Sequence, residues 1–175
     1  MKRIAITLLT LLLLSPSTVF GQTRKRSTSR QKPASTAQTE ARAAQVRTQG
    51  AQRVAEQIKL LTKFIYLLGG ASSGIAAVDE AVRRNEASPT VVQQNQQSKV
   101  QVKTGITNFR MGLDKLEIDF RATPELQPYY IKLAGVAAGA ATAEEQAAAN
   151  QFDRSGRTLL DVVNRLADVL VIMRQ

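Results

Sequence analysis

The side chains in this sequence best suited to acid, base or metal-binding chemistry are carboxylates. The chain contains no His and no Cys, so it lacks the usual zinc ligands, the attachment site of c-type haem and the usual Cys or Ser-His-Asp catalytic groups. It also contains no Walker or dinucleotide-binding glycine loop and no EF-hand spacing of acidic residues. We therefore predict a protein that is not an enzyme and that binds neither a cofactor nor a metal.

Asp79 is the carboxylate whose position is most unusual, because it lies in phase with a series of apolar residues. A buried acid there would need a partner or a raised pKa, and it could mark a functional site. The alternative is an ion pair with Arg83 one helical turn later, and we favour it because charged residues are mostly found at surfaces. Asp114 and Glu117, one turn apart beside several basic residues, indicate a solvated ion-pair face in the same way.

Two segments with G-x-x-x-G spacing, one holding Gly70 and Gly74 and the other Gly135 and Gly139, could let helix backbones approach closely. One hypothesis is a membrane-inserting pair of helices. Charged residues bound both uncharged runs, however, and leave them shorter than the roughly 20 residues of a membrane span. We therefore expect these glycines to pack the first predicted helix against the third.

Apolar residues recur at spacings of three and four in four segments, which predicts four amphipathic helices. Short links between helices favour antiparallel neighbours, so we predict an all-α fold, an antiparallel up-down four-helix bundle with long helices. The expected helices cover about residues 51–86, 89–122, 124–140 and 142–174.

Local signals set these boundaries. Ser88 and Pro89 suit the start of the second helix, although the alternation in 99–107 would also fit a strand. Thr142 and Glu145 form a capping box, which predicts the start of the last helix.

The first helix is expected to be irregular at one point and well buried in its middle. Gly69 and Gly70 interrupt the apolar pattern without changing its phase, so we predict one long helix with a kink there. Leu60, Phe64 and Leu67 widen its apolar face, which favours burial. Helical spacing likewise favours a core position for the three tyrosines over a ligand groove; they are Tyr66, Tyr129 and Tyr130.

Residues 1–21 have the sequence pattern of a secretory signal peptide, with a basic start, an apolar stretch and a cleavage position near Gly21. An uncleaved membrane anchor is the alternative, although the apolar run is about half of the roughly 20 residues that a span needs. Residues 22–50 follow as a basic linker rich in Ser, Thr, Gln and Ala, which we predict to be partly disordered. Residues 51–175 form the predicted bundle domain.

These features favour an exported, periplasmic or extracellular, non-enzymatic protein that binds or scaffolds a component of the envelope. An anionic envelope component or another protein is the expected partner, with peripheral membrane contact at most, no specific nucleic acid and the option of a homo-oligomer. Carriage of a small apolar ligand between helices is one alternative. A holdase is another, because the overall plan is similar in general terms to periplasmic holdase chaperones. The residues expected to contact an anionic partner are Arg24, Lys25, Arg26, Arg30 and Lys32.

Overall fold

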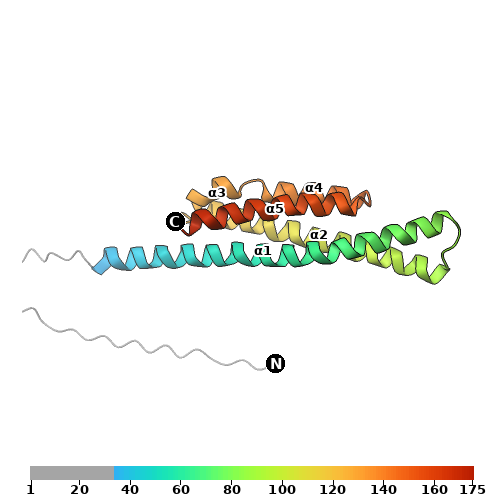
Figure 1. Cartoon of the computed structure of the whole chain (residues 1–175). Coiled ribbons are helices and arrows are strands. Elements are labelled where there is room, and N and C mark those ends of the chain that lie inside the picture. The colour runs from blue at the N-terminus through green and yellow to red at the C-terminus, as the bar shows by residue number, and fades with distance from the viewer. Residues whose placement is uncertain (1–33) are drawn as a thin grey trace, which may run out of the picture. The chain divides into compact units, whose positions relative to one another are not determined.

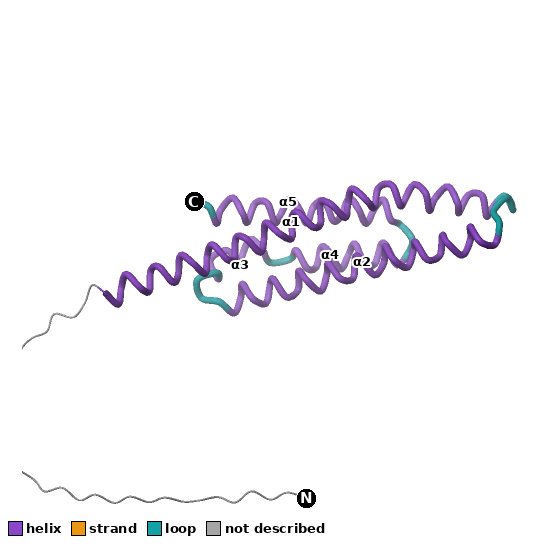
Figure 2. Tube along the Cα trace, turned by 90° about the horizontal axis from the view of Figure 1, so that it is seen from below, coloured by secondary structure: helices purple, strands orange, loops and turns teal. Residues whose placement is uncertain are grey.

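The computed structural model describes residues 34–175, so the predicted signal peptide and the basic cluster of the linker lie outside the described range. The described residues form five α-helices and no strand (Figures 1 and 2). This result confirms the predicted all-α class. The helices are α1 Ala34–Arg83, α2 Pro89–Ala122, α3 Gln127–Leu133, α4 Val136–Ala148 and α5 Phe152–Met173.

The long helices lie alongside one another as a helical bundle. Helix α1 contacts α2 and α5, and α4 contacts the same two helices from the other side. Short α3 packs across one end against α2 and α5. Figure 1 shows that α1 and α2, and likewise α4 and α5, run in opposite directions, and that the hairpin of α1 and α2 projects beyond the other helices. Among the described residues, the bundle is therefore thickest in its middle and only two helices wide at the end of this hairpin.

Helix α1 begins earlier than the sequence pattern indicated. It starts at Ala34, not near residue 51, and its first turns are rich in Ala, Gln and Arg, which favour helix. Gly50 is buried, and a Cβ built on it would lie 2.7 Å from Leu126 Cδ2. The end of the expected linker is thus helical and already belongs to the bundle.

The predicted kink at Gly69 and Gly70 does not break α1, which stays helical from Ala34 to Arg83. The buried residues Leu68 and Ser72 keep the helix seated on its neighbours on either side of the two glycines. Figure 1 shows only a gradual curve in the green part of α1.

The last two predicted helices have different bounds in the structure. Gly135 adopts a left-handed backbone with φ of 94°, which separates α3 from α4. Thr142 is interior to α4, where its hydroxyl donates to the carbonyl of Ala138, so the predicted capping box does not start a helix. The alanine-rich stretch continues α4 instead, until Asn150 turns the chain with φ of 60°. The predicted boundary was wrong because the tertiary fold overrides a local cap signal.

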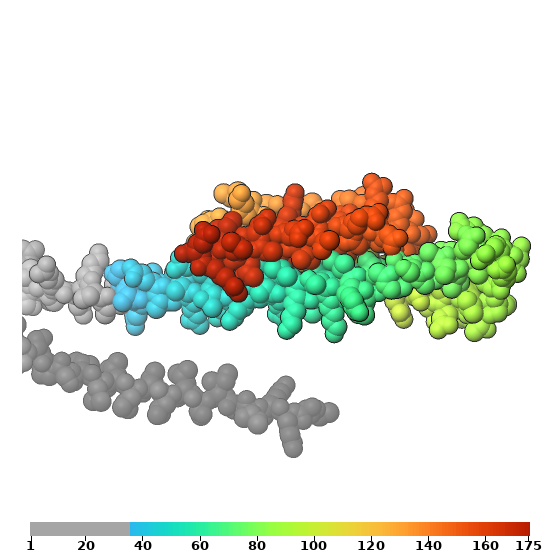
Figure 3. Space-filling model, in the orientation of Figure 1, coloured from blue at the N-terminus to red at the C-terminus, as the bar shows by residue number. Residues whose placement is uncertain are grey.

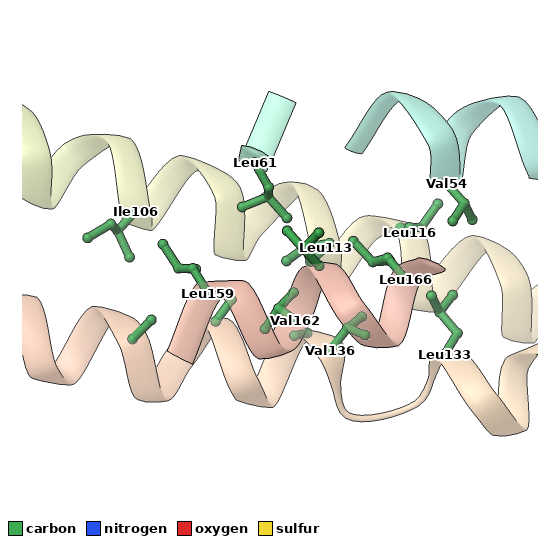
Figure 4. Packing of buried hydrophobic residues seen from close by; sticks show 14 of the residues in the cluster. Val54, Leu61, Ile106, Leu113, Leu116, Leu133, Val136, Leu159, Val162 and Leu166 are labelled. Atoms are coloured by element: carbon green, nitrogen blue, oxygen red, sulfur yellow. The ribbon is translucent and has the colours of Figure 1, made fainter. Parts of the chain in front are cut away.

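The apolar core runs along the axis between α1, α2, α4 and α5 (Figure 4). Alanines at the buried positions of α4 allow that helix to lie close to its neighbours, while larger residues fill the space from the other side. Burying each leucine contributes about 1.5–3 kcal/mol relative to exposure. The fully buried leucines are Leu61, Leu113, Leu126, Leu133, Leu159 and Leu166.

Two glycines in helices should respond in opposite ways to the same substitution. A Cβ on Gly69 meets no atom within 4 Å, so Gly69→Ala should raise the free energy of unfolding by about 1 kcal/mol through helix propensity. A Cβ on Gly139 would lie 2.8 Å from Val162 Cγ2, so Gly139→Ala should lower it by about 1–2 kcal/mol. Urea unfolding of the two variants measures both effects, and equal shifts would contradict the close contact of α4 with α5.

Candidate functional site

Asp79 lies at the start of the projecting hairpin, where it binds two side chains of α2. Its Oδ1 accepts hydrogen bonds from Asn95 Nδ2 at 2.8 Å and from Lys99 Nζ at 2.6 Å. Asn95 is buried, and the side chain of Lys99 is only 12% exposed. The expected ion pair with Arg83 is not formed, because Arg83 binds Glu80 instead.

This cluster is chemically self-contained. One carboxylate charge faces one ammonium charge, and the buried amide finds a partner on the same oxygen. Buried polar groups that are paired in this way tend to fix the register of helices. We conclude that Asp79 aligns α1 with α2 where apolar packing becomes thin.

Removing both members of the pair should cost less than the sum of the costs of removing each one alone. Asp79→Ala leaves the largely buried Lys99 without its anion and should lower the free energy of unfolding by about 1–2 kcal/mol. In the double variant Asp79→Ala, Lys99→Met the loss of stability should be smaller, by about 1 kcal/mol, than the sum of the losses in the two single variants. Glu80→Ala, which breaks an exposed pair, is the control and should change stability by less than about 0.5 kcal/mol. Additive costs in a urea-based double-mutant cycle would rule out the pairing.

A second polar cluster ties α2 to α4. Glu144 accepts a hydrogen bond from Thr107 Oγ1 at 2.5 Å and another from Arg110 Nε at 2.6 Å. Arg110 also donates to Asp114 on its own helix at 2.9 Å. The bond from Thr107 lowers the pKa of Glu144 below its usual value, burial partly opposes that shift, and Arg110 adds to the lowering.

The hydrogen bond between Thr107 and Glu144 should therefore make a pH-dependent contribution to stability. Because the pKa of Glu144 is lowered on folding, the contribution is present above the unfolded value near 4.5 and is lost as the pH falls through the folded value. Thr107→Val should raise the pKa of Glu144. The variant should be less stable than the wild type, and this difference in the free energy of unfolding should be larger at about pH 7 than at about pH 2.5. Carboxyl NMR titration and urea unfolding measure the two effects. Exposed Thr104→Val is the control, and a Thr107→Val cost that is the same at both pH values would contradict this role.

Glu117 has a different role from the solvated ion pair that its spacing indicated. Its Oε1 accepts hydrogen bonds from the backbone N–H groups of Gly135 at 3.0 Å and Ala137 at 2.8 Å. These N–H groups at the start of α4 have no acceptor within the helix, and the helix dipole favours a carboxylate at this end. Asp114 does form the expected ion pair with Arg110. The two carboxylates therefore serve different helices, and neither is arranged as half of a catalytic pair.

An open groove with charges of both signs lies between α1 and the start of α5. Ser72 Oγ donates to Asp153 Oδ1 at 2.5 Å on its floor, and the volume of the groove is about 410 Å³. Arg154 and Arg157 line the same groove, are exposed and form no ion pair among the described residues. The groove can attract an anionic group, but it is too open to exclude water from a bound molecule.

A second groove, of about 530 Å³, lies between the early part of α1 and the end of α5. Arg47 and Arg174 line it together with Tyr129 and the partly buried Leu170. It too is open to solvent and does not enclose a ligand. Residues 34–175 contain no group of three or more acidic side chains that could hold a metal ion.

The four glycines of the G-x-x-x-G segments lie in three different settings. Gly139 packs against Val162 of α5, and Gly135 forms the turn before α4, with Arg165 Nη1 3.1 Å from its Cβ position. A Cβ on Gly70 or Gly74 meets nothing within 4 Å. The expected contact between the first and third helices is therefore not formed, and the close approach in this region is between α4 and α5.

Part of the apolar face of α1 that was expected to be buried is exposed, whereas Phe64, Tyr129 and Tyr130 are partly buried against the core as expected. Leu60 is 46% exposed, Leu67 is 59% exposed and Tyr66 is 82% exposed. Sequence reasoning missed this face because it assigned every apolar position of the helix to one core. The signal that could have found it is a second seven-residue repeat, from Leu60 through Leu67 and Gly74 to Ala81.

No protein-family description, curated protein or solved structure matches this chain. Within the described range, the segment Thr36–Arg83 of α1 is long and apolar enough to cross a membrane, with a mean hydropathy of 1.3 in an 18-residue window. Only 22% of that window is buried, and core helices of soluble proteins meet the same criterion. The basic residues at 24–32 that were expected to contact an anionic partner lie outside the described residues.

Proposed function

We propose that this protein is an exported, non-enzymatic binding or scaffold protein of the cell envelope. In this proposal its bundle is a rigid support, and its cationic N-terminal segment attracts an anionic partner. The partner chemistry is a surface of fixed negative charge, such as anionic headgroups or an acidic polysaccharide. Attraction to such a surface is long-ranged at low salt and is screened at high salt.

The observation that carries this proposal is the segregation of charge along the chain. Residues 22–50 hold seven basic residues and one acidic residue, a net charge of +6, whereas residues 51–175 hold 15 and 13, a net charge of +2. Arg42 and Arg47, on the first turns of α1, are exposed and form no ion pair among the described residues. The positive charge is therefore concentrated toward one end of the sequence, and its two described members, Arg42 and Arg47, are not neutralised by an ion pair with the described residues.

The bundle itself supports a binding role more than a catalytic one. Asp79, Glu117 and Glu144 are each held by partners on another helix. No buried polar side-chain atom among the described residues lacks a hydrogen bond. A site with unused, poised acids would favour an enzyme, and the arrangement here favours structure.

The proposal is tested by removing the same amount of positive charge from two different parts of the chain. Replacing the five basic residues at 24, 25, 26, 30 and 32 with Gln should weaken binding to phosphatidylglycerol vesicles at least about tenfold and should reduce retention in envelope fractions. The matched control makes the same replacement at five exposed bundle positions that form no ion pair there, and it should retain binding; these are Arg121, Lys132, Arg154, Arg157 and Arg165. Equal losses in both variants, or no loss in either, would contradict a role for the N-terminal segment.

A further inference from the structure

The exposed face of α1 between Leu60 and Ala81 has no function within the single chain. In a straight helix, residues 60, 63, 67, 70, 74, 77 and 81 follow one side. No charged residue occurs between Lys63 and Asp79, a stretch of four turns. Figure 3 shows α1 running uncovered along the lower edge of the molecule, and the other helices contact it from elsewhere.

Such a face is costly if it stays in water. Exposed faces of soluble helices normally carry charged or polar residues, and contiguous exposed apolar residues mark contact surfaces. Gly70 and Gly74 add about 1 kcal/mol each of lost helix propensity relative to Ala. Nothing lies within 4 Å of their Cβ positions in the chain, so the fold makes no use of the space they leave.

The shape of the face is complementary to itself when reversed. Its first half carries the large side chains of Leu60 and Leu67, and its second half carries only the small residues Gly70, Gly74, Ala77 and Ala81. An antiparallel copy with its two-fold axis between residues 70 and 71 would place Leu67 opposite Gly74 of the second copy and Leu60 opposite Ala81. Each of the two leucines would then meet a small residue, as in close helix pairs.

The positions of the charged residues also favour an antiparallel pair. In a parallel pair, Lys59 and Lys63 would each face the same lysine of the second copy. In the antiparallel pair Lys59 and Lys63 would instead face positions 82 and 78 of the second copy, which are both valines, so the like charges are kept apart. Avoiding like charges across an interface selects the orientation of the partners.

We propose that this face of α1 is the interface of a homodimer, in which two copies of the chain pair antiparallel through residues 60–81. The dimer does not depend on the cationic segment at residues 22–33. A lipid surface is the competing occupant of the same face, and the experiment separates the two.

The first test fills the gap that the dimer needs. Gly74→Leu should convert a dimer into a monomer, with at least about a tenfold increase in the dimer dissociation constant from sedimentation equilibrium of the chain expressed with its native N-terminus. Its monomer should stay folded, because a Cβ at this position meets nothing within 4 Å. Gly69→Leu is the matched control: Gly69 is equally unobstructed but lies about 140° around the helix from Gly74 and about 100° from Gly70, so this variant should remain dimeric. A wild-type monomer, or a dimer that Gly74→Leu leaves intact, would overturn the proposal.

The second test determines direction and does not depend on the leucine variant. The chain has no Cys, so a single introduced thiol reports only its own position. Under oxidation Gly70→Cys, beside the two-fold axis, should give a covalent dimer, whereas Leu60→Cys should not, because the two copies of residue 60 lie about 30 Å apart along the axis at 1.5 Å per residue. Cross-linking at both positions, or only at Leu60, would overturn the antiparallel pair.

The third measurement addresses the competing occupant. Dimerisation predicts that Gly74→Leu changes the mass of the free protein and leaves its sedimentation with phosphatidylglycerol vesicles unchanged. If the free protein is monomeric and Gly74→Leu abolishes vesicle binding, the face contacts lipid and the homodimer is excluded. Neutralising the basic residues at 24–32 should leave the dimer intact, so failure of the charge-driven function and failure of the dimer are distinguishable.

Discussion

The structure depends on the burial of the apolar stripe of α5 against α1 and α4. This stripe cannot remain in water, and the chain has no Cys for a disulfide and, in the described residues, no acidic cluster for a metal. Leu159 and Leu166 are completely buried where α1, α2 and α4 meet them (Figure 4). Hydrophobic burial along one axis therefore has to hold four helices in register. The other features of the molecule are arranged around that axis or project from it.

Polar residues supply what apolar packing leaves undetermined. At the thin end of the bundle, Asp79, Asn95 and Lys99 align α1 with α2. Further along α2, Thr107 and Arg110 bind Glu144 of α4, and Glu117 binds the backbone at the start of α4. Directional bonds of this kind fix position, whereas apolar contact alone tolerates sliding. The carboxylates of Asp79, Glu117 and Glu144 thus fix the helices relative to one another.

The two proposals place binding on two separate segments of the chain. The basic segment precedes α1, while the exposed apolar face occupies the middle of that helix. In an antiparallel dimer the first turns of the two copies of α1, with exposed Arg42 and Arg47, would point in opposite directions.

The sequence by itself determined the all-α class, the extent of α2 from Pro89 to Ala122 and the core face of α5, because helical periodicity and local caps act over one or two turns. It did not locate the break at Gly135 or the end of α4 at Asn150. Those turns depend on Glu117, 18 residues from Gly135 along the chain, and on packing of α4 against α5. Only the tertiary structure decided which apolar side of α1 is buried, since a helix with two apolar faces carries no local sign of which one its neighbours will cover. The partners of Asp79 were decided in the same way, by which residues of α2 lie across from it in space.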